Sequence, residues 1–216
     1  MNSPGFLQKI LIVGGTFCPP HLAHIAIASA VQHQFAFDDV IFVPCKEPVL
    51  DKVTNLSTTH RVAMLRLALQ PYPDFTLDLC EINRNAPSYM VTTLTDFRHR
   101  FGEHASITLL IGMDNFLQLL RWHHWESILT VSHLLVVDRA GITQNIPAIL
   151  QTLLTEHQPT AKNNVSTIPY GTIERYDAGQ YEISSTKIRT GIQTAIKTDV
   201  LAPSVREYIV KHKLFM

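Results

Sequence analysis

KILIVGGTFCPPHLAH, residues 9–24, contains a strand, a turn and the start of a helix in direct succession. The run Lys9–Val13, KILIV, is continuous and branched enough for a central strand that is buried on both faces of a sheet. Gly14 and Gly15 allow a sharp turn and close approach of a ligand to the backbone. A helix of period near 3.6 follows over about His21–Phe35. This order predicts one unit of an α/β fold with an anion site at the helix start.

The same alternation continues along the chain. Apolar runs alternate with segments of helical period, which is typical of parallel strands joined by crossover helices. Further strands are expected at Asp39–Val43, Phe75–Leu79, Ile107–Ile111, His133–Val137 and Val165–Pro169. Helices are expected at about Thr58–Gln70, Tyr89–Phe101, Asn115–Leu120, Trp125–Leu129 and Ala148–Glu156, and in two pieces after Ser184 that break near Pro203. The sequence contains no long linker, so it predicts one domain over residues 1–216 with a small helical part from about residue 184.

Composition excludes several classes of protein. The 216 residues carry 18 basic and 18 acidic side chains, which removes the electrostatic reason to expect nucleic acid or an anionic membrane as partner. No apolar run approaches the roughly 20 residues that span a bilayer, and no secretory leader is visible. Cys18, Cys45 and Cys80 are an odd, widely spaced set that fits neither a disulfide framework nor a zinc site. A cytoplasmic location is expected, and an oligomer is possible.

His21 and His24 lie three residues apart on the first turn of the predicted helix. At this spacing both imidazoles project from one helix face toward the predicted anion site. Taken alone, the pair also fits two surface histidines or half of a metal site. A zinc site needs a third ligand, and neither Cys18 nor Cys45 offers a recognisable spacing for one.

A second helix start lies in EISSTKIR, residues 182–189. Ser184 is a natural N-cap, and Ser185, Thr186 and Arg189 lie around the helix N-terminus that follows it. Two hydroxyls and a guanidinium suit a triphosphate, because Arg can bind two phosphate oxygens at once. Taken alone, the segment also fits a capped surface helix.

Together, GGTFCPPHLAH and ISSTKIR resemble the motifs of the nucleotidylyltransferase superfamily that flank the triphosphate of ATP. The intervening segments are similar to nicotinate-nucleotide adenylyltransferases. These segments are FVP at Phe42–Pro44, HRVAML at His60–Leu65, NAPSYMVTTL at Asn85–Leu94, IGMDNFLQLLRWHHWESIL at Ile111–Leu129 and SHLLVVDRAG at Ser132–Gly141, and the closing LAPSVREYIVKHKLF is also similar. The resemblance implies a Rossmann-like, doubly wound parallel sheet. It also implies transfer of AMP from MgATP to nicotinate mononucleotide, giving nicotinate adenine dinucleotide and pyrophosphate in NAD biosynthesis.

The resemblance assigns residues to ATP. The acceptor phosphate attacks the α-phosphorus in line, so the enzyme contributes alignment and charge stabilisation rather than a nucleophile. The implied catalytic residues are His21, His24 and Arg189, and Mg²⁺ is carried by the ATP phosphates rather than by protein ligands. The implied ATP-binding set is Gly14, Gly15, Thr16, Phe17, His24, Asp114, Arg139, Ser185, Thr186 and Arg189.

The resemblance also assigns four residues to the acceptor. Trp122 matches a family tryptophan that stacks on the pyridine ring, although a core aromatic is the alternative. Ser88, Tyr89 and Thr93 fall in a loop and helix whose backbone amides and hydroxyls can recognise the nicotinate carboxylate.

Three positions depart from the family pattern. Cys18 replaces an aspartate, Ala23 replaces a glycine, and a basic pair after FVP becomes Leu50 and Asp51, with Lys46 and Lys52 nearby. Because Cys18 lies near a helix N-terminus, a lowered thiol pKa is expected there. Two alternatives stay open: a sister enzyme whose acceptor is nicotinamide mononucleotide or phosphopantetheine, and a non-catalytic nucleotide-binding paralogue.

Overall fold

A six-stranded, fully parallel sheet forms the centre of the computed structural model, which describes residues 7–50, 54, 56–138, 145–162, 164–179, 183–192 and 199–215. The strands are β1 (Lys9–Gly15), β2 (Asp39–Pro44), β3 (Phe75–Leu77), β4 (Ser106–Gly112), β5 (His133–Asp138) and β6 (Ile173–Asp177). Their order is β3-β2-β1-β4-β5-β6. This is the doubly wound, Rossmann-like order, in which the direction of winding reverses between β1 and β4.

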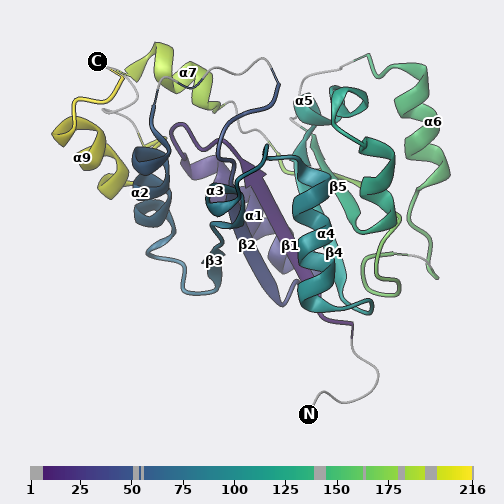
Figure 1. Ribbon diagram of the computed structural model, residues 1–216. Helices are drawn as coiled ribbons and strands as arrows, with labels where there is room; N and C mark the ends of the chain where they lie inside the picture. The colour runs from purple at the N-terminus through teal and green to yellow at the C-terminus, as the bar shows by residue number, and fades with distance from the viewer. Residues whose placement is uncertain are drawn as a thin grey trace.

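Helices cover both faces of the sheet (Figure 1). One face packs against α1 (Leu22–Phe35) and α2 (Thr58–Leu69), and the other against α4 (Met90–Phe101), α5 (Met113–Phe116), the 3₁₀ segment η2 (Trp125–Thr130) and α6 (Ala148–Glu156). Leu11 and Val13 of β1 point to the α1 side, whereas Ile10 and Ile12 point to the α4 side. A strand covered on both faces needs apolar residues at successive positions, which explains the continuous apolar run at the start of the chain.

The C-terminal part packs on α2 (Figure 1). It contains α7 (Ser185–Thr190) and α9 (Pro203–Lys211). Its apolar cluster joins two buried α2 positions to six buried positions of the C-terminal part. These residues are Met64, Ala68, Ile188, Ile192, Leu201, Val205, Ile209 and Leu214. This packing places the start of α7 at the same edge of the sheet as the end of β1.

The expected elements match with three corrections. The helix expected at about Asn115–Leu120 is divided, because α5 ends at Phe116 and a separate 3₁₀ segment, η1 (Leu119–Arg121), follows it. The strand expected at Val165–Pro169 is wrong: backbone turn bonds from Thr167 and Ile168 to Asn164 occupy this segment, and the last strand is β6. The sequence of β6, IERYD, buries only one residue fully, so it lacks the apolar run by which the inner strands were recognised. The strand expected at Phe75–Leu79 ends at Leu77, and a short helix, α3 (Cys80–Asn83), follows it.

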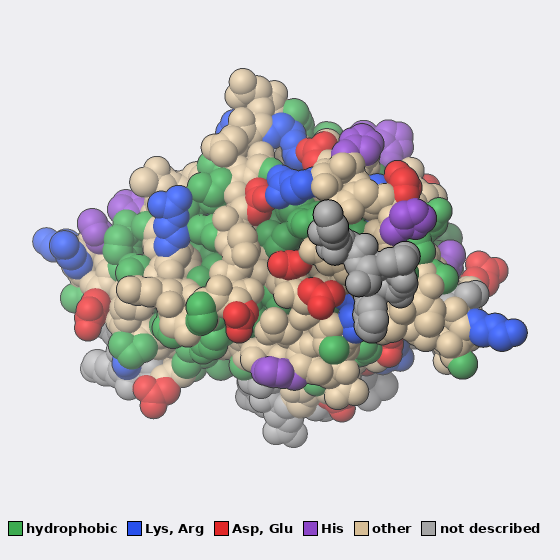
Figure 2. Space-filling model, turned by 90° about the horizontal axis from the view of Figure 1, so that it is seen from below, with side chains coloured by type: hydrophobic (Ala, Val, Ile, Leu, Met, Phe, Trp, Pro, Cys, Tyr) green, Lys and Arg blue, Asp and Glu red, His purple; other side chains and the backbone are tan. Residues whose placement is uncertain are grey.

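The surface carries mixed charge on the face shown in Figure 2, where basic and acidic side chains lie interspersed. This mixture agrees with the equal numbers of basic and acidic residues in the sequence. Within the described ranges, no helix combines the length and apolar character needed to cross a membrane.

We expect Ile209→Ala to lower the free energy of unfolding by about 2–5 kcal/mol, because it leaves a cavity at a fully buried position between α9 and α2. The neighbouring Val210 is about half exposed, so Val210→Ala is the matched control and should change stability by less than about 0.5 kcal/mol. Urea unfolding of both variants measures the difference. Equal effects of the two substitutions would show that α9 does not pack as described.

The buried His133 should make stability depend on pH. Its Nδ1 accepts from the Thr172 backbone N–H, so the neutral ring donates from Nε2 to the Ile168 carbonyl. Burial lowers the pKa of His133 from 6.5 to about 4. The stabilising effect of the neutral ring is therefore lost as the pH falls from the pKa of the unfolded state, 6.5, toward the pKa of the folded state, about 4. Wild type should lose about 2 kcal/mol more than His133→Asn between pH 7.5 and pH 5 in denaturant unfolding. Parallel pH curves for the two proteins would contradict this.

Candidate active site

A hollow of about 400 Å³ opens where β1 and β4 end, at the point where the direction of winding reverses. In doubly wound sheets, ligands bind in the crevice beyond the carboxyl ends of the strands at this point. The lining comes from four parts of the chain: Gly14, Gly15 and Thr16; Cys45, Pro48, Val49 and Leu50; Glu81, Ser88, Tyr89 and Met90; Asn115, Gln118, Arg121, Trp122 and His123. A second hollow, of about 570 Å³, lies at the far end of the sheet near the starts of β2 and β3, away from both motifs.

The turn after β1 is tightly constrained. A Cβ at Gly15 would lie 3.1 Å from the Phe17 ring, so glycine lets that ring fold back over the turn. Phe17 itself has φ of 48°, in the left-handed region that a non-glycine residue rarely adopts. The Cys45 backbone N–H donates to the Gly15 carbonyl at 2.9 Å and extends the pairing of β1 with β2 past the strand ends.

His21 and His24 lie together at the start of α1. Their rings stack with centroids 3.6 Å apart, and the edge of Phe17 meets the His24 ring. His21 is the N-cap residue, and its backbone N–H donates to His24 Nδ1 at 3.1 Å. Because Nδ1 accepts this bond, the neutral His24 ring carries its proton on Nε2. This arrangement gives His24 a hydrogen-bond donor beside the N-terminus of a 14-residue helix.

The second motif contacts the first directly. The Arg189 guanidinium donates to the Cys18 carbonyl at 2.8 Å, and the Ser185 hydroxyl donates to the Pro19 carbonyl at 3.0 Å. Arg189 also donates to the Thr186 hydroxyl at 3.1 Å. The two segments that the sequence singled out for phosphate binding therefore share one site, although more than 160 residues separate them.

Aromatic side chains gather on the opposite side of the hollow. Tyr89 and Trp122 both line it, and the His123 ring stacks on Tyr89 at 4.0 Å. Trp122 follows a short 3₁₀ segment, η1 (Leu119–Arg121), and also packs against the core with part of its surface. Trp122 thus both lines the hollow and packs against the core, as the two alternatives from the sequence had it.

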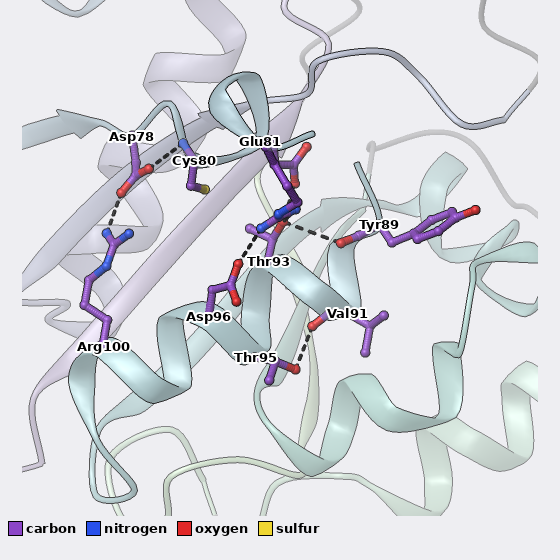
Figure 3. Close-up of polar contacts among 10 residues, drawn as sticks. Asp78, Cys80, Glu81, Tyr89, Val91, Thr93, Thr95, Asp96 and Arg100 are labelled. Atoms are coloured by element: carbon purple, nitrogen blue, oxygen red, sulfur yellow. Dashed lines mark hydrogen bonds and ion pairs between the residues drawn. The ribbon is translucent and has the colours of Figure 1, made fainter. Parts of the chain in front are cut away.

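Ser88 and Thr93 belong to a buried hydrogen-bond network around Glu81. The Thr93 hydroxyl donates to Glu81 Oε1 at 2.7 Å and accepts from Arg84, which also pairs with Asp96 (Figure 3). Ser88 also hydrogen bonds to Glu81. Thr93 is fully buried and is not among the residues that line the hollow, whereas Ser88 and Glu81 are.

Glu81 was not expected from the sequence. Burial raises the pKa of its carboxyl group, against the opposing effects of the Thr93 and Ser88 hydrogen bonds and the Arg84 charge. It lies in α3, a four-residue helix that the sequence pattern did not predict. A buried carboxylate satisfied by two hydroxyls holds Ser88 and Thr93 at fixed positions behind the acceptor side of the hollow.

One expected ATP contact lies on the β4 side. Asp114 is exposed in the first turn of α5, immediately after the end of β4. The other, Arg139, falls outside the described residues. Asp114 thus lies beyond the carboxyl end of a central strand.

The lowered pKa expected for the Cys18 thiol is wrong. Its side chain is 2% exposed, and burial raises the pKa of its thiol; the nearby Arg189 and Arg61 charges offset this effect only in part. A lowered pKa was expected because Cys18 lies near a helix N-terminus. The sequence alone does not show that the thiol faces the protein interior. Ala23 is also buried, so this side chain faces the interior.

The basic residues near the hollow differ from those expected. Lys46 Nζ donates to the Arg84 carbonyl at 2.9 Å, which ties it to the 80–88 segment. Lys52 falls outside the described residues. Arg121 lines the hollow and is exposed. Among the described lining residues, it is the one with a Lys or Arg side chain.

Comparison with known proteins agrees with this geometry. A family model described as cytidylyltransferase-like matches residues 12–191. A probable nicotinate-nucleotide adenylyltransferase of Legionella pneumophila (strain Paris) is 42% identical over 212 residues, which cover 97% of this chain and 100% of that protein. A protein of the same description from Pseudoalteromonas atlantica is 35% identical and covers 94% of this chain and 93% of its own length.

Solved structures share the fold. Plasmodium falciparum nicotinic acid mononucleotide adenylyltransferase complexed with NaAD aligns with a TM-score of 0.69 and 16% identity, covering 96% of this chain and 97% of that one. A putative nicotinate-nucleotide adenylyltransferase from Vibrio parahaemolyticus aligns with a TM-score of 0.61 and 19% identity, covering 97% and 96%. The family match over residues 12–191 and the 42% identity over the whole relative lead to one conclusion. The chain belongs to the cytidylyltransferase-like family and, within it, to the nicotinate-nucleotide adenylyltransferases.

Proposed function

We propose that this chain transfers the AMP group of ATP to nicotinate mononucleotide and releases pyrophosphate, which makes nicotinate adenine dinucleotide for NAD biosynthesis. The observation that carries the proposal is the contact of Arg189 and Ser185 with the Cys18 and Pro19 carbonyls. This contact supports a shared site for a guanidinium, hydroxyls and the two histidines that follow the turn after β1. The relatives' names, which specify nicotinate nucleotides, support the choice of acceptor.

On the ATP side, the turn and α7 form the phosphate site. Gly14, Gly15, Thr16 and Phe17 provide the backbone cradle, and the sparse side chains allow close approach. His21, His24, Ser185, Thr186 and Arg189 then contact the triphosphate, with His24 Nε2–H donating to the oxygens where charge develops. Asp114 binds the ribose, and Arg139 lies near the adenosine.

On the acceptor side, Trp122 stacks on the pyridine ring, with Tyr89 as the neighbouring wall. Ser88 and Thr93 act from behind, because their hydroxyls are held by Glu81. Arg121 is the cation best placed for the acceptor phosphate, since it is the basic side chain among the described residues that line the hollow. This arrangement replaces the basic pair that the family carries after its FVP segment.

Magnesium enters with the nucleotide. Among the described residues, no group of three or more His, Cys, Asp or Glu side chains could hold a metal ion. The donors around the turn are backbone amides, imidazoles, hydroxyls and a guanidinium, which suit phosphate oxygens, whereas Mg²⁺ prefers carboxylates and phosphates. The residues present therefore fit a metal that is carried by the triphosphate, where it neutralises charge on the oxygens.

The acceptor is tested by pyrophosphate release from MgATP, with nicotinate mononucleotide, nicotinamide mononucleotide and phosphopantetheine offered separately. We expect the highest kcat/KM with nicotinate mononucleotide. A preference for either other acceptor would indicate the corresponding sister enzyme. Binding of ATP without turnover on any acceptor would indicate a non-catalytic nucleotide-binding protein.

We expect His24→Ala to lower kcat on the order of a hundredfold, because it removes a hydrogen-bond donor aimed at developing charge. His33→Ala is the matched control: it removes an exposed histidine from the last turn of the same helix and should leave kcat unchanged. Steady-state kinetics at saturating substrates, with circular dichroism to confirm folding, measure both. Near-normal turnover of folded His24→Ala would remove His24 from the mechanism.

We expect Trp122→Ala to raise KM for nicotinate mononucleotide about tenfold and to leave KM for ATP nearly unchanged, because a stacked base contributes about 1–3 kcal/mol. Trp122→Phe should recover most of the loss. Trp125→Ala is the control, because Trp125 packs on the same core but does not line the hollow. A rise in both KM values for Trp122→Ala would contradict the stacking role.

A further inference from the structure

Arg61 is the largest side chain that the fold buries almost completely, with 1% of its surface exposed. It lies near the start of α2, beneath the candidate active site. Its guanidinium donates from Nη1 to the Thr16 carbonyl at 2.9 Å and from Nη2 to the Lys46 carbonyl at 2.6 Å. Nη2 also reaches the Thr58 hydroxyl at 3.2 Å. One side chain thus contacts two separate loops.

The two carbonyls belong to opposite halves of the site. Thr16 lies in the turn after β1, which the proposed function assigns to ATP. Lys46 lies in the loop after β2, and its backbone N–H donates to the Ser88 hydroxyl at 3.0 Å on the acceptor side. The Thr58 hydroxyl also donates to the Lys46 carbonyl, at 3.3 Å. Arg61 is therefore a bridge between the phosphate turn and the network of Ser88 and Glu81.

The burial of this charge is costly for folding. None of the ion pairs within the described ranges includes Arg61, so only neutral oxygens compensate its charge there. Its Nε is buried and has no hydrogen-bond partner in the part of the chain that the structure describes. A hydrophobic side chain would fill the same space at lower cost, since burying a cation without a counter-charge is strongly unfavourable. Stability alone does not explain an arginine at this position.

The hydrogen bonds fix the orientation of two peptide groups. In a planar trans peptide, the N–H points opposite to the C=O. With the Thr16 carbonyl turned toward Arg61, the Phe17 N–H must point away from it. The same holds for the Lys46 carbonyl and the Glu47 N–H. The guanidinium thus determines the direction of one amide in each half of the site, and both halves share one rigid planar fork.

We propose that Arg61 is a positioning residue for adenylyl transfer, which holds the phosphate turn and the acceptor loop in the relative geometry that in-line attack requires. The proposal rests on the proposed function. Its effect should fall on kcat, because misalignment of two bound reactants slows the chemical step more than it weakens the binding of either.

A matched control exists in the same fold. Arg98 is also buried, and its guanidinium donates to backbone carbonyls that include those of Gly102, Val131 and Pro169. These carbonyls lie before β4 and β5 or near β6, at the end of the sheet away from the hollow. Arg98→Lys therefore removes the same kind of interaction without touching the site.

The test compares Arg61→Lys with Arg98→Lys. Lysine keeps the charge but loses the planar fork, so it cannot hold both carbonyls in the same geometry. For Arg61→Lys we expect kcat to fall by about tenfold or more, while KM for ATP and for nicotinate mononucleotide changes by less than about threefold. Arg98→Lys should lower the melting temperature and leave kcat near that of wild type.

The outcomes are distinct. A folded Arg61→Lys with kcat near wild type would overturn the proposal, as would an equal loss of kcat in Arg98→Lys. If Arg61→Lys does not fold, Thr58→Val tests the proposal instead. Valine keeps the shape of the threonine side chain but removes the hydrogen bonds of the Thr58 hydroxyl to Arg61 and to the Lys46 carbonyl. A loss of kcat of about threefold or more in this variant supports the bridge, and unchanged kcat overturns it. Failure of wild type to turn over nicotinate mononucleotide would instead reject the proposed function.

Discussion

The site depends on one constraint: the carbonyls of the turn after β1 face the protein. Those of Gly15, Thr16, Cys18 and Pro19 each accept a hydrogen bond from a residue distant in the sequence, and two of the four donors lie in α7. The donors are the Cys45 N–H, Arg61, Ser185 and Arg189. With its negative dipole ends satisfied inside, the turn presents less negative potential to a polyphosphate. This explains how a chain with no net charge can build a local site for an anion.

The acceptor side follows a different physical principle. Its walls include the aromatic Tyr89 and Trp122 together with the polar Ser88 and Glu81, and Thr93 lies behind them in a network centred on Glu81. Each hydroxyl in that network has both a donor and an acceptor partner, as for Thr93 between Arg84 and Glu81. Such a network fixes side-chain positions because any rotation leaves a buried polar atom unsatisfied. The ATP side uses backbone geometry, whereas the acceptor side uses side-chain geometry.

The sequence predicted the fold well where the pattern was local. The apolar run of β1 and the glycines after it mark the central strand and turn, and the helix ends of α6 match the expected ones. The strand β6 could not be predicted, because an edge strand with polar residues has no continuous apolar run. The motifs singled out the turn after β1 and the start of α7, and the structure brings these two segments into direct contact.

What the sequence could not show was burial. Arg61 and Glu81 are single charged residues in short segments, where a solvent-exposed position is the usual expectation. The Cys18 thiol was expected to have a lowered pKa for a related reason: proximity to a helix start is visible in the sequence, but the direction of the thiol is not. In all three cases the deciding property is which way one side chain points, and long-range packing sets it.

The contact between Arg189 and the Cys18 carbonyl has a consequence for the order of folding. Protein synthesis proceeds from the N-terminus, so β1 and its turn leave the ribosome long before residue 189 does. The central strands can pair in that interval, whereas the turn lacks two of its four donors until α7 arrives. Nascent chains thus acquire the sheet before they acquire the phosphate site, and catalytic competence is among the last properties to form.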